Sequence, residues 1–153
     1  SDGYRQNRVH RFSAEGELIT SWGAGVAGTG PGEFDLPHDV TVDKNDRVYV
    51  MDRANNRCQI FNVDGEYQEE WPDIIVPNDA VIDDEDVMHV AEGVPPAILV
   101  TTLSGEVLGR WGEQGDGPGQ FAGIPHGLWM DAQGDVYVAQ VGADNALNRY
   151  TRV

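Results

Sequence analysis

The chain has 153 residues, with 26 Asp and Glu against 10 Lys and Arg, which gives a formal net charge of −16 at pH 7. Such an acidic surface repels nucleic-acid phosphates and anionic lipid headgroups, so the composition excludes nucleic-acid and membrane partners. No apolar run approaches the ~20 residues of a membrane helix, and no signal peptide opens the sequence. The single cysteine, Cys58, can form no internal disulfide, so the fold is not expected to depend on oxidation.

Nineteen Gly and eight Pro residues among Val, Ile, Trp and Tyr predict many short strands joined by tight turns. No segment keeps a 3.6-residue apolar period, so helices are expected to be nearly absent. In chain order, the first half predicts strands at Arg8–Phe12, Leu18–Trp22, Leu36–Asp43, Val48–Asp52, Cys58–Phe61 and Tyr67–Trp71. The second half predicts strands at Val76–Asp83, Val87–Ala91, Ile98–Val100, Val107–Trp111, Ile124–Asp131, Val136–Gln140 and Asn148–Tyr150.

An internal repeat organises these strands. The motif at Leu36–Asp43 returns at Val76–Asp83 and again at Ile124–Asp131, and each copy leads into further apolar stretches. Before each expected fourth strand stands a hairpin signal that ends in glycine: Glu15-Gly16, Asp64-Gly65 and Ser104-Gly105. Four strands in each period of 40–48 residues are typical of a β-propeller blade.

The all-β chain is therefore expected to be a partial propeller of about three to three and a half four-stranded blades. We expect half a blade over residues 1–35, blades over 36–75 and 76–123, and an incomplete blade over 124–153. An open arc of blades leaves edge strands exposed. We therefore expect the missing half of a longer propeller, or a second copy of the chain, to close it.

Two histidines are the candidate metal ligands. His38 and His126 occupy equivalent places in the first strand of their blades, and first strands line the central channel of a propeller. Imidazoles are good zinc ligands, although each ring can instead simply bind nearby backbone. Other residues are expected to be structural: His10, His89, Cys58, and the tryptophans that end fourth strands, Trp22, Trp71 and Trp111.

The motif Pro-x-x-Val-x-Val-Asp, followed by Val-Tyr-Val-x-Asp-Arg-x-Asn-x-Arg-x-Gln-Ile-Phe, resembles the NHL repeat. The opening Ser1-Asp2-Gly3-Tyr4, with Asn7-Arg8-Val9 and Phe12-Ser13, resembles the lyase domain of the peptidylglycine α-amidating monooxygenases and its bacterial relatives. The resemblance covers nearly the whole chain and aligns it with the C-terminal half of a six-bladed propeller. It implies cleavage of a peptidyl α-hydroxyglycine to an amide and glyoxylate.

The resemblance also implies site residues. His38 and His126 match two of the three zinc ligands of that domain, and the third would lie outside this chain. Tyr4 matches an active-site tyrosine that could move a proton, and Arg53 matches an arginine that could orient a substrate carboxylate. From the residues alone, Tyr4 could equally pack at a blade top, and Arg53 could pair with Asp52 or Asp39.

This chain departs from the lyase pattern at Gly127, where that domain has an aspartate of a structural calcium site. The resemblance therefore does not bring Ca²⁺ to this sequence, and the chain alone is expected to be inactive. A non-catalytic propeller that binds a protein or a small ligand is the alternative. By resemblance, a bacterial periplasmic or secreted location is plausible.

Overall fold

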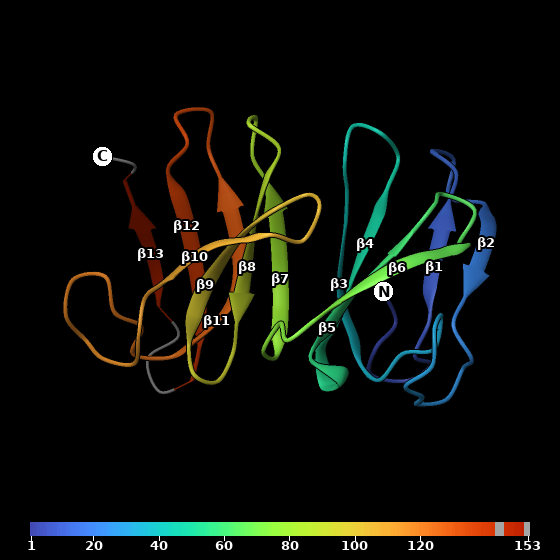
Figure 1. Ribbon diagram of the computed structural model, residues 1–153, viewed down its shortest axis with the longest axis horizontal. Helices are drawn as coiled ribbons and strands as arrows, with labels where there is room; N and C mark the ends of the chain where they lie inside the picture. The colour runs from blue at the N-terminus through green and yellow to red at the C-terminus, as the bar shows by residue number, and fades with distance from the viewer. Residues whose placement is uncertain (143–145, 152–153) are drawn as a thin grey trace. The chain divides into compact units, whose positions relative to one another are not determined.

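The computed structural model describes residues 1–142 and 146–151 (Figure 1). The chain divides into two compact units, Ser1–Ile74 and Ile75–Val153. Each unit contains two antiparallel sheets. The only helix among the described residues is a three-residue 3-10 helix, as the lack of a helical period predicts.

The first unit holds a two-stranded and a four-stranded sheet. The smaller sheet pairs β1 (Val9–Phe12) with β2 (Leu18–Trp22). The larger sheet runs in the order β3 (Pro37–Val42), β4 (Val48–Asp52), β5 (Arg57–Phe61) and β6 (Tyr67–Pro72), with the 3-10 helix η1 (Arg53–Asn55) between β4 and β5. Every residue of β4 and β5 is buried, including the polar residues Asp52, Arg57 and Gln59.

The second unit repeats this plan. One sheet has the order β7 (Pro77–Ile82), β8 (Val87–Glu92), β9 (Ala97–Thr102) and β10 (Val107–Trp111). The other has the order β11 (Ile124–Met130), β12 (Val136–Val141) and β13 (Leu147–Tyr150). Consecutive antiparallel strands in every sheet are the blade pattern that the repeat predicts. The chain is thus a partial β-propeller of NHL type, with open sheets of two, four, four and three strands.

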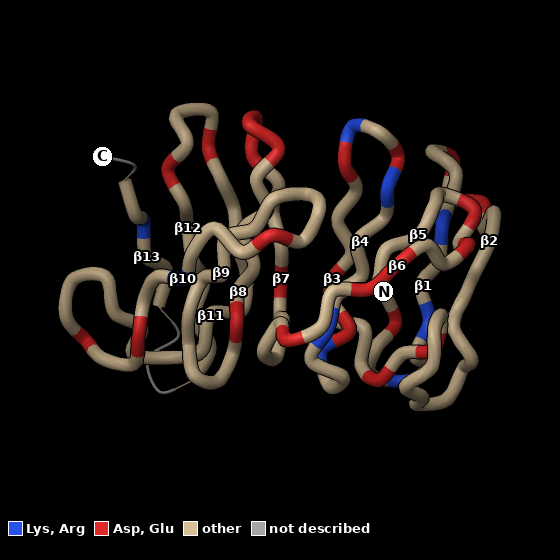
Figure 2. Tube along the Cα trace, viewed as in Figure 1, with Lys and Arg blue, Asp and Glu red and all other residues tan. Residues whose placement is uncertain are grey.

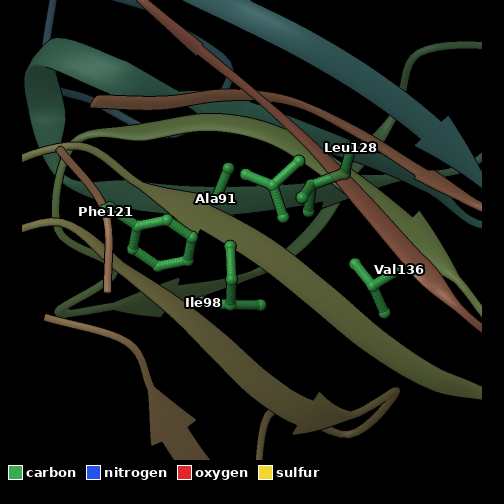
Figure 3. Close-up of a cluster of buried hydrophobic side chains, with 6 residues drawn as sticks. Ala91, Ile98, Phe121, Leu128 and Val136 are labelled. Carbon is green, nitrogen blue, oxygen red and sulfur yellow. The ribbon is translucent and has the colours of Figure 1, made fainter. Parts of the chain in front are cut away.

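Equivalent aromatic clusters form the core of each unit. In the first unit, Phe34 and Phe61 pack with Trp22 beside Val48 and Val50. In the second unit, the core consists of Ala91, Ile98, Phe121, Leu128, Val136 and Val138 (Figure 3). Trp111 and Tyr150 pack against this core. Trp22 and Trp111 therefore pack between sheets, as expected.

The acidic residues recur in the turns. Figure 2 shows this most clearly in the hairpin between β7 and β8, which carries Asp83-Asp84-Glu85-Asp86. Among the described residues, no helix has the length and apolar character that crossing a membrane requires.

Candidate functional site

The first strand of each repeat (β3, β7 and β11) carries a β-bulge, which lies at the position that holds the candidate ligands in β3 and β11. In β3, Pro37 pairs with Asp52 and Asp39 pairs with Met51, so His38 is the extra residue. The same register shift makes Asn78 the extra residue in β7 and His126 the extra residue in β11. A bulge re-aims a side chain and is common beside active sites. The repeat position that sequence analysis singled out is therefore structurally distinct in all three sheets.

Backbone strain accompanies two of the bulges. Leu36, with φ of 60°, and Val76, with φ of 47°, both precede the proline that starts the bulged strand. Positive φ is costly for a residue with a side chain, above all for a β-branched one such as Val76. Contacts with the surrounding residues must therefore hold the residue before each of these strands in its left-handed backbone conformation.

The N-terminal segment brings Tyr4 to His38. The Tyr4 hydroxyl and Nε2 of His38 are 3.2 Å apart and form a hydrogen bond, while Ser1 Oγ donates to the His38 carbonyl at 3.2 Å. Gly3 permits this approach, because a Cβ there would lie 2.5 Å from the Pro37 carbonyl oxygen. Tyr4 is 74% exposed, so it does not serve as a packing residue within this chain.

Arg53 lies at the start of η1, and its backbone N–H donates to the carbonyl of Leu36, the residue before Pro37. The structure does not show the alternative that Arg53 forms a salt bridge with Asp52 or Asp39. Within the described ranges, its half-buried guanidinium makes no ion pair or hydrogen bond. A guanidinium in that state, in a protein this acidic, remains able to bind an anion.

Asp52 instead belongs to a buried network that sequence reasoning missed. It is fully buried and accepts from Arg57 Nε at 2.8 Å and Asn55 Nδ2 at 2.9 Å. Arg57 also donates to the carbonyls of Thr29, Gly30 and Glu33 in the preceding loop. The sequence signal for this network was the Asp-Arg-x-Asn-x-Arg stretch. Its second arginine, Arg57, anchors the loop, whereas its first, Arg53, does not.

The second unit holds the other candidate, His126, on β11. Asn78 on β7 donates from Nδ2 to the Pro125 carbonyl at 2.7 Å, so the two bulged segments are joined directly. Gly127 follows His126 and offers no side-chain oxygen for Ca²⁺. Across residues 1–142 and 146–151, no three His, Cys, Asp or Glu side chains lie together in a way that would hold a cation.

The remaining expectations concern structural residues. Cys58 is fully buried, and burial raises the pKa of its thiol far above the ordinary range. His10 Nδ1 lies 2.7 Å from Ser21 Oγ across the β1–β2 pair. His89 Nε2 lies 3.4 Å from Asp83 Oδ2 within one hairpin. Each of the three side chains is thus accounted for by packing or by a local partner.

Comparison with known proteins agrees with this description. The NHL repeat model matches residues 34–61. NHL repeat-containing protein 3 of Mus musculus is 34% identical over 152 residues, which cover 93% of this chain and 42% of that protein. The peptidylglycine alpha-amidating monooxygenase of Rattus norvegicus is 40% identical over 67 residues, which cover 42% of this chain and 7% of that protein. The chain therefore spans less than half the length of these curated relatives.

Among solved structures, virginiamycin B lyase of Staphylococcus aureus matches with a TM-score of 0.65 at 16% identity, over 95% of this chain and 49% of that one. At this identity the match supports the fold alone. Fold, repeat and relatives together define an NHL-repeat β-propeller. More particularly, residues 34–61 match the NHL repeat, and the chain is similar in part to the amidating monooxygenase and lyase sequences.

Proposed function

We propose that this chain forms part of the channel of a propeller that cleaves a peptidyl α-hydroxyglycine, or a related small hydroxylated substrate. The observation that carries the proposal is the 3.2 Å hydrogen bond between the Tyr4 hydroxyl and Nε2 of His38 at the bulge of β3. It joins the two residues of the first unit to which the resemblance gives a proton-moving and a metal-binding role. Relatives named as amidating monooxygenases and as a probable amidating lyase support the same reading.

The proposed reaction breaks the bond between the substrate Cα and the amide nitrogen. The α-hydroxyl loses its proton and becomes the aldehyde of glyoxylate, while the leaving nitrogen gains a proton and becomes the primary amide. Tyr4 is proposed to accept the hydroxyl proton as a phenolate, to which Nε2–H of His38 would donate while Nδ1 serves as the metal-binding atom, and then to pass that proton to the leaving nitrogen. Arg53 is proposed to hold the substrate carboxylate through its two-pronged guanidinium.

Zinc fits this chain only in part. Catalytic zinc takes three protein ligands and keeps one open position, and the described residues bring no such set together. We propose His38 and His126 as two ligands, with a further one supplied by a second copy or by the rest of a longer propeller. When bound, zinc would polarise the substrate hydroxyl. The proton transfer described above is assigned to this chain's own residues alone.

Glyoxylate release from a short peptidyl α-hydroxyglycine tests the proposal. The chain by itself is expected to be inactive, because its ligand set is incomplete. A zinc-loaded complete propeller that carries this chain is expected to turn over, and its Tyr4→Phe and Arg53→Gln variants are expected to be slower. General acid–base groups typically contribute about 10²–10⁴-fold, so Tyr4→Phe should cost that much in kcat. Turnover that both substitutions leave intact would contradict the proposal.

A non-catalytic binding module is the second candidate, because one fold can carry either catalysis or binding. In that case Tyr4 and Arg53 would contact a peptide or small ligand without chemistry. The same assay distinguishes the two candidates. A complete propeller that binds the peptidyl hydroxyglycine in calorimetry but releases no glyoxylate is a binding module.

A further inference from the structure

His126 lies between two hydrogen bonds that come from the neighbouring sheet. Asn78 Nδ2 donates to the carbonyl of Pro125, the residue before His126, at 2.7 Å. The backbone N–H of Leu128, two residues after His126, donates to Asp79 Oδ2 at 2.6 Å. The donor Asn78 and the acceptor Asp79 are consecutive residues of β7, so one short segment holds β11 on both sides of the histidine.

Because of the bulge, these two hydrogen bonds matter for the position of the backbone at His126. In the β11–β12 ladder, Pro125 pairs with Gln140 and Gly127 pairs with Ala139, so the register shifts at His126, the bulged residue. The regular ladder therefore does not fix the backbone at His126 as it does along the rest of the strand. Hydrogen bonds from β7 therefore help to hold the backbone from which the imidazole extends.

Burial strengthens the effect of these bonds. Asn78 is only 1% exposed, and Leu128 is buried in the core of this unit. A hydrogen bond shielded from water is expensive to lose, because a buried group is left unsatisfied.

We propose that Asn78 and Asp79 are positioning residues for His126. Their two hydrogen bonds fix the backbone on either side of the bulge and so aim the imidazole. The inference rests on the proposed function only where it treats His126 as a zinc ligand, since the positioning itself is a property of the zinc-free chain. The inference also assigns a role to Asn78, which stands in the middle repeat at the position that His38 and His126 occupy in the other two. Its amide would hold the backbone next to His126.

The ring resonances of His126 in zinc-free protein test the inference, measured by NMR of histidine-labelled chain. Asn78→Ala and Asp79→Ala should shift or broaden the His126 signals and leave those of His38 and His10 unchanged. Asp79→Asn should disturb the His126 signals less than Asp79→Ala, because its one side-chain oxygen can still accept from the Leu128 N–H. Asp39→Ala, the matched change on β3, should leave His126 unmoved. Identical His126 signals in wild type, Asn78→Ala and Asp79→Ala overturn the inference.

Addition of zinc chloride to the same samples separates this inference from the proposed function. Residues that orient a metal ligand typically affect metal affinity by about 10–100-fold, so Asn78→Ala should need that much more zinc to perturb His126. If zinc fails to perturb His126 even in wild type, the proposed function loses its second ligand, while the ring signals still decide the positioning role. If Asp79→Ala does not fold, Asn78→Ala and Asp79→Asn carry the test.

Discussion

Arg57 and Asp52 are cross-strand partners in β5 and β4, and Nε of Arg57 donates to Oδ2 of Asp52 at 2.8 Å. The same place in the β12–β13 pair is occupied by Ala146 and Gln140, where Gln140 N–H donates to the Ala146 carbonyl at 2.8 Å. One blade thus uses a buried ion pair where another uses a neutral pair. In the β8–β9 pair, Glu92 keeps the buried acid while Ala97 stands at the arginine position, and Arg110 on β10 supplies the cation instead. Each buried carboxylate is thus coupled to a cation.

This coupling predicts the stability of two variants. Arg57→Ala leaves the fully buried carboxylate of Asp52 without its cation, and removing one partner of a buried pair costs on the order of 3–5 kcal/mol. Combining Arg57→Ala with Asp52→Gln reproduces the neutral pair, so the double variant should be more stable than the single one. Urea unfolding followed by tryptophan fluorescence measures both. A double variant no more stable than Arg57→Ala would show that the two positions are independent.

Two hairpin glycines form a second matched pair. Gly65 has φ of 84° and Gly16 has φ of 87°, so alanine at either position meets the same backbone strain of roughly 1–2 kcal/mol. A Cβ on Gly65 would also lie 2.7 Å from the Trp22 ring, whereas nothing lies within 4 Å of one on Gly16. We therefore expect Gly65→Ala to be the more destabilising change, by about a further 1–3 kcal/mol from overpacking. Equal melting temperatures for the two variants would mean that Trp22 moves aside without cost.

The order of strands and the hairpin turns followed from sequence because they depend on local signals. Apolar stretches separated by glycine turns predict antiparallel neighbours, and Gly16, Gly65 and Gly105 adopt the positive φ that such turns require. The recurrence of His38 and His126 behind a proline likewise identified one structural position. The bulge at that position is the finding that makes the repeat meaningful.

Side-chain partners between sheets did not follow from sequence. Tyr4 reaches His38 across 34 positions, and Asn78 reaches Pro125 across 47. Such contacts depend on the twist and stacking of the sheets, which a linear pattern does not specify. The two arginines of the Asp-Arg-x-Asn-x-Arg stretch show the same limit, because spacing alone did not reveal that Arg57 is the one that pairs with Asp52.

Cys58 predicts a dependence of stability on pH. Burial raises the pKa of its thiol, whereas the unfolded thiol titrates near ~8.5. The folded state therefore binds the proton more tightly, so this contribution to stability is complete below about pH 8.5 and is lost as the pH rises further. Unfolding free energy should fall more steeply between about pH 8.5 and 10.5 in wild type than in Cys58→Ala. Native protein should also fail to react with a disulfide reagent at pH 8, and rapid reaction there would contradict the buried, neutral thiol.

A final prediction comes from the inner hairpins, in which an aspartate caps the turn and binds a side chain six residues later. Tyr49 donates to Asp43 at 3.2 Å and Tyr137 donates to Asp131 at 3.2 Å, but the equivalent of these tyrosines in β8 is His89, 3.4 Å from Asp83.

His89 stabilises its hairpin less well than the tyrosines do, because its buried Nδ1 has no hydrogen-bond partner among the residues that the structure describes. It also lines a pocket of about 400 Å³ that has room for a larger ring. His89→Tyr removes the unsatisfied atom and restores the hydroxyl-to-carboxylate bond, so we expect a gain on the order of 0.5–1.5 kcal/mol. The reciprocal change in β12, Tyr137→His, should lose a comparable amount. Urea unfolding measures the stability of both variants. A less stable His89→Tyr protein would mean that the histidine is kept at that position for the fold itself.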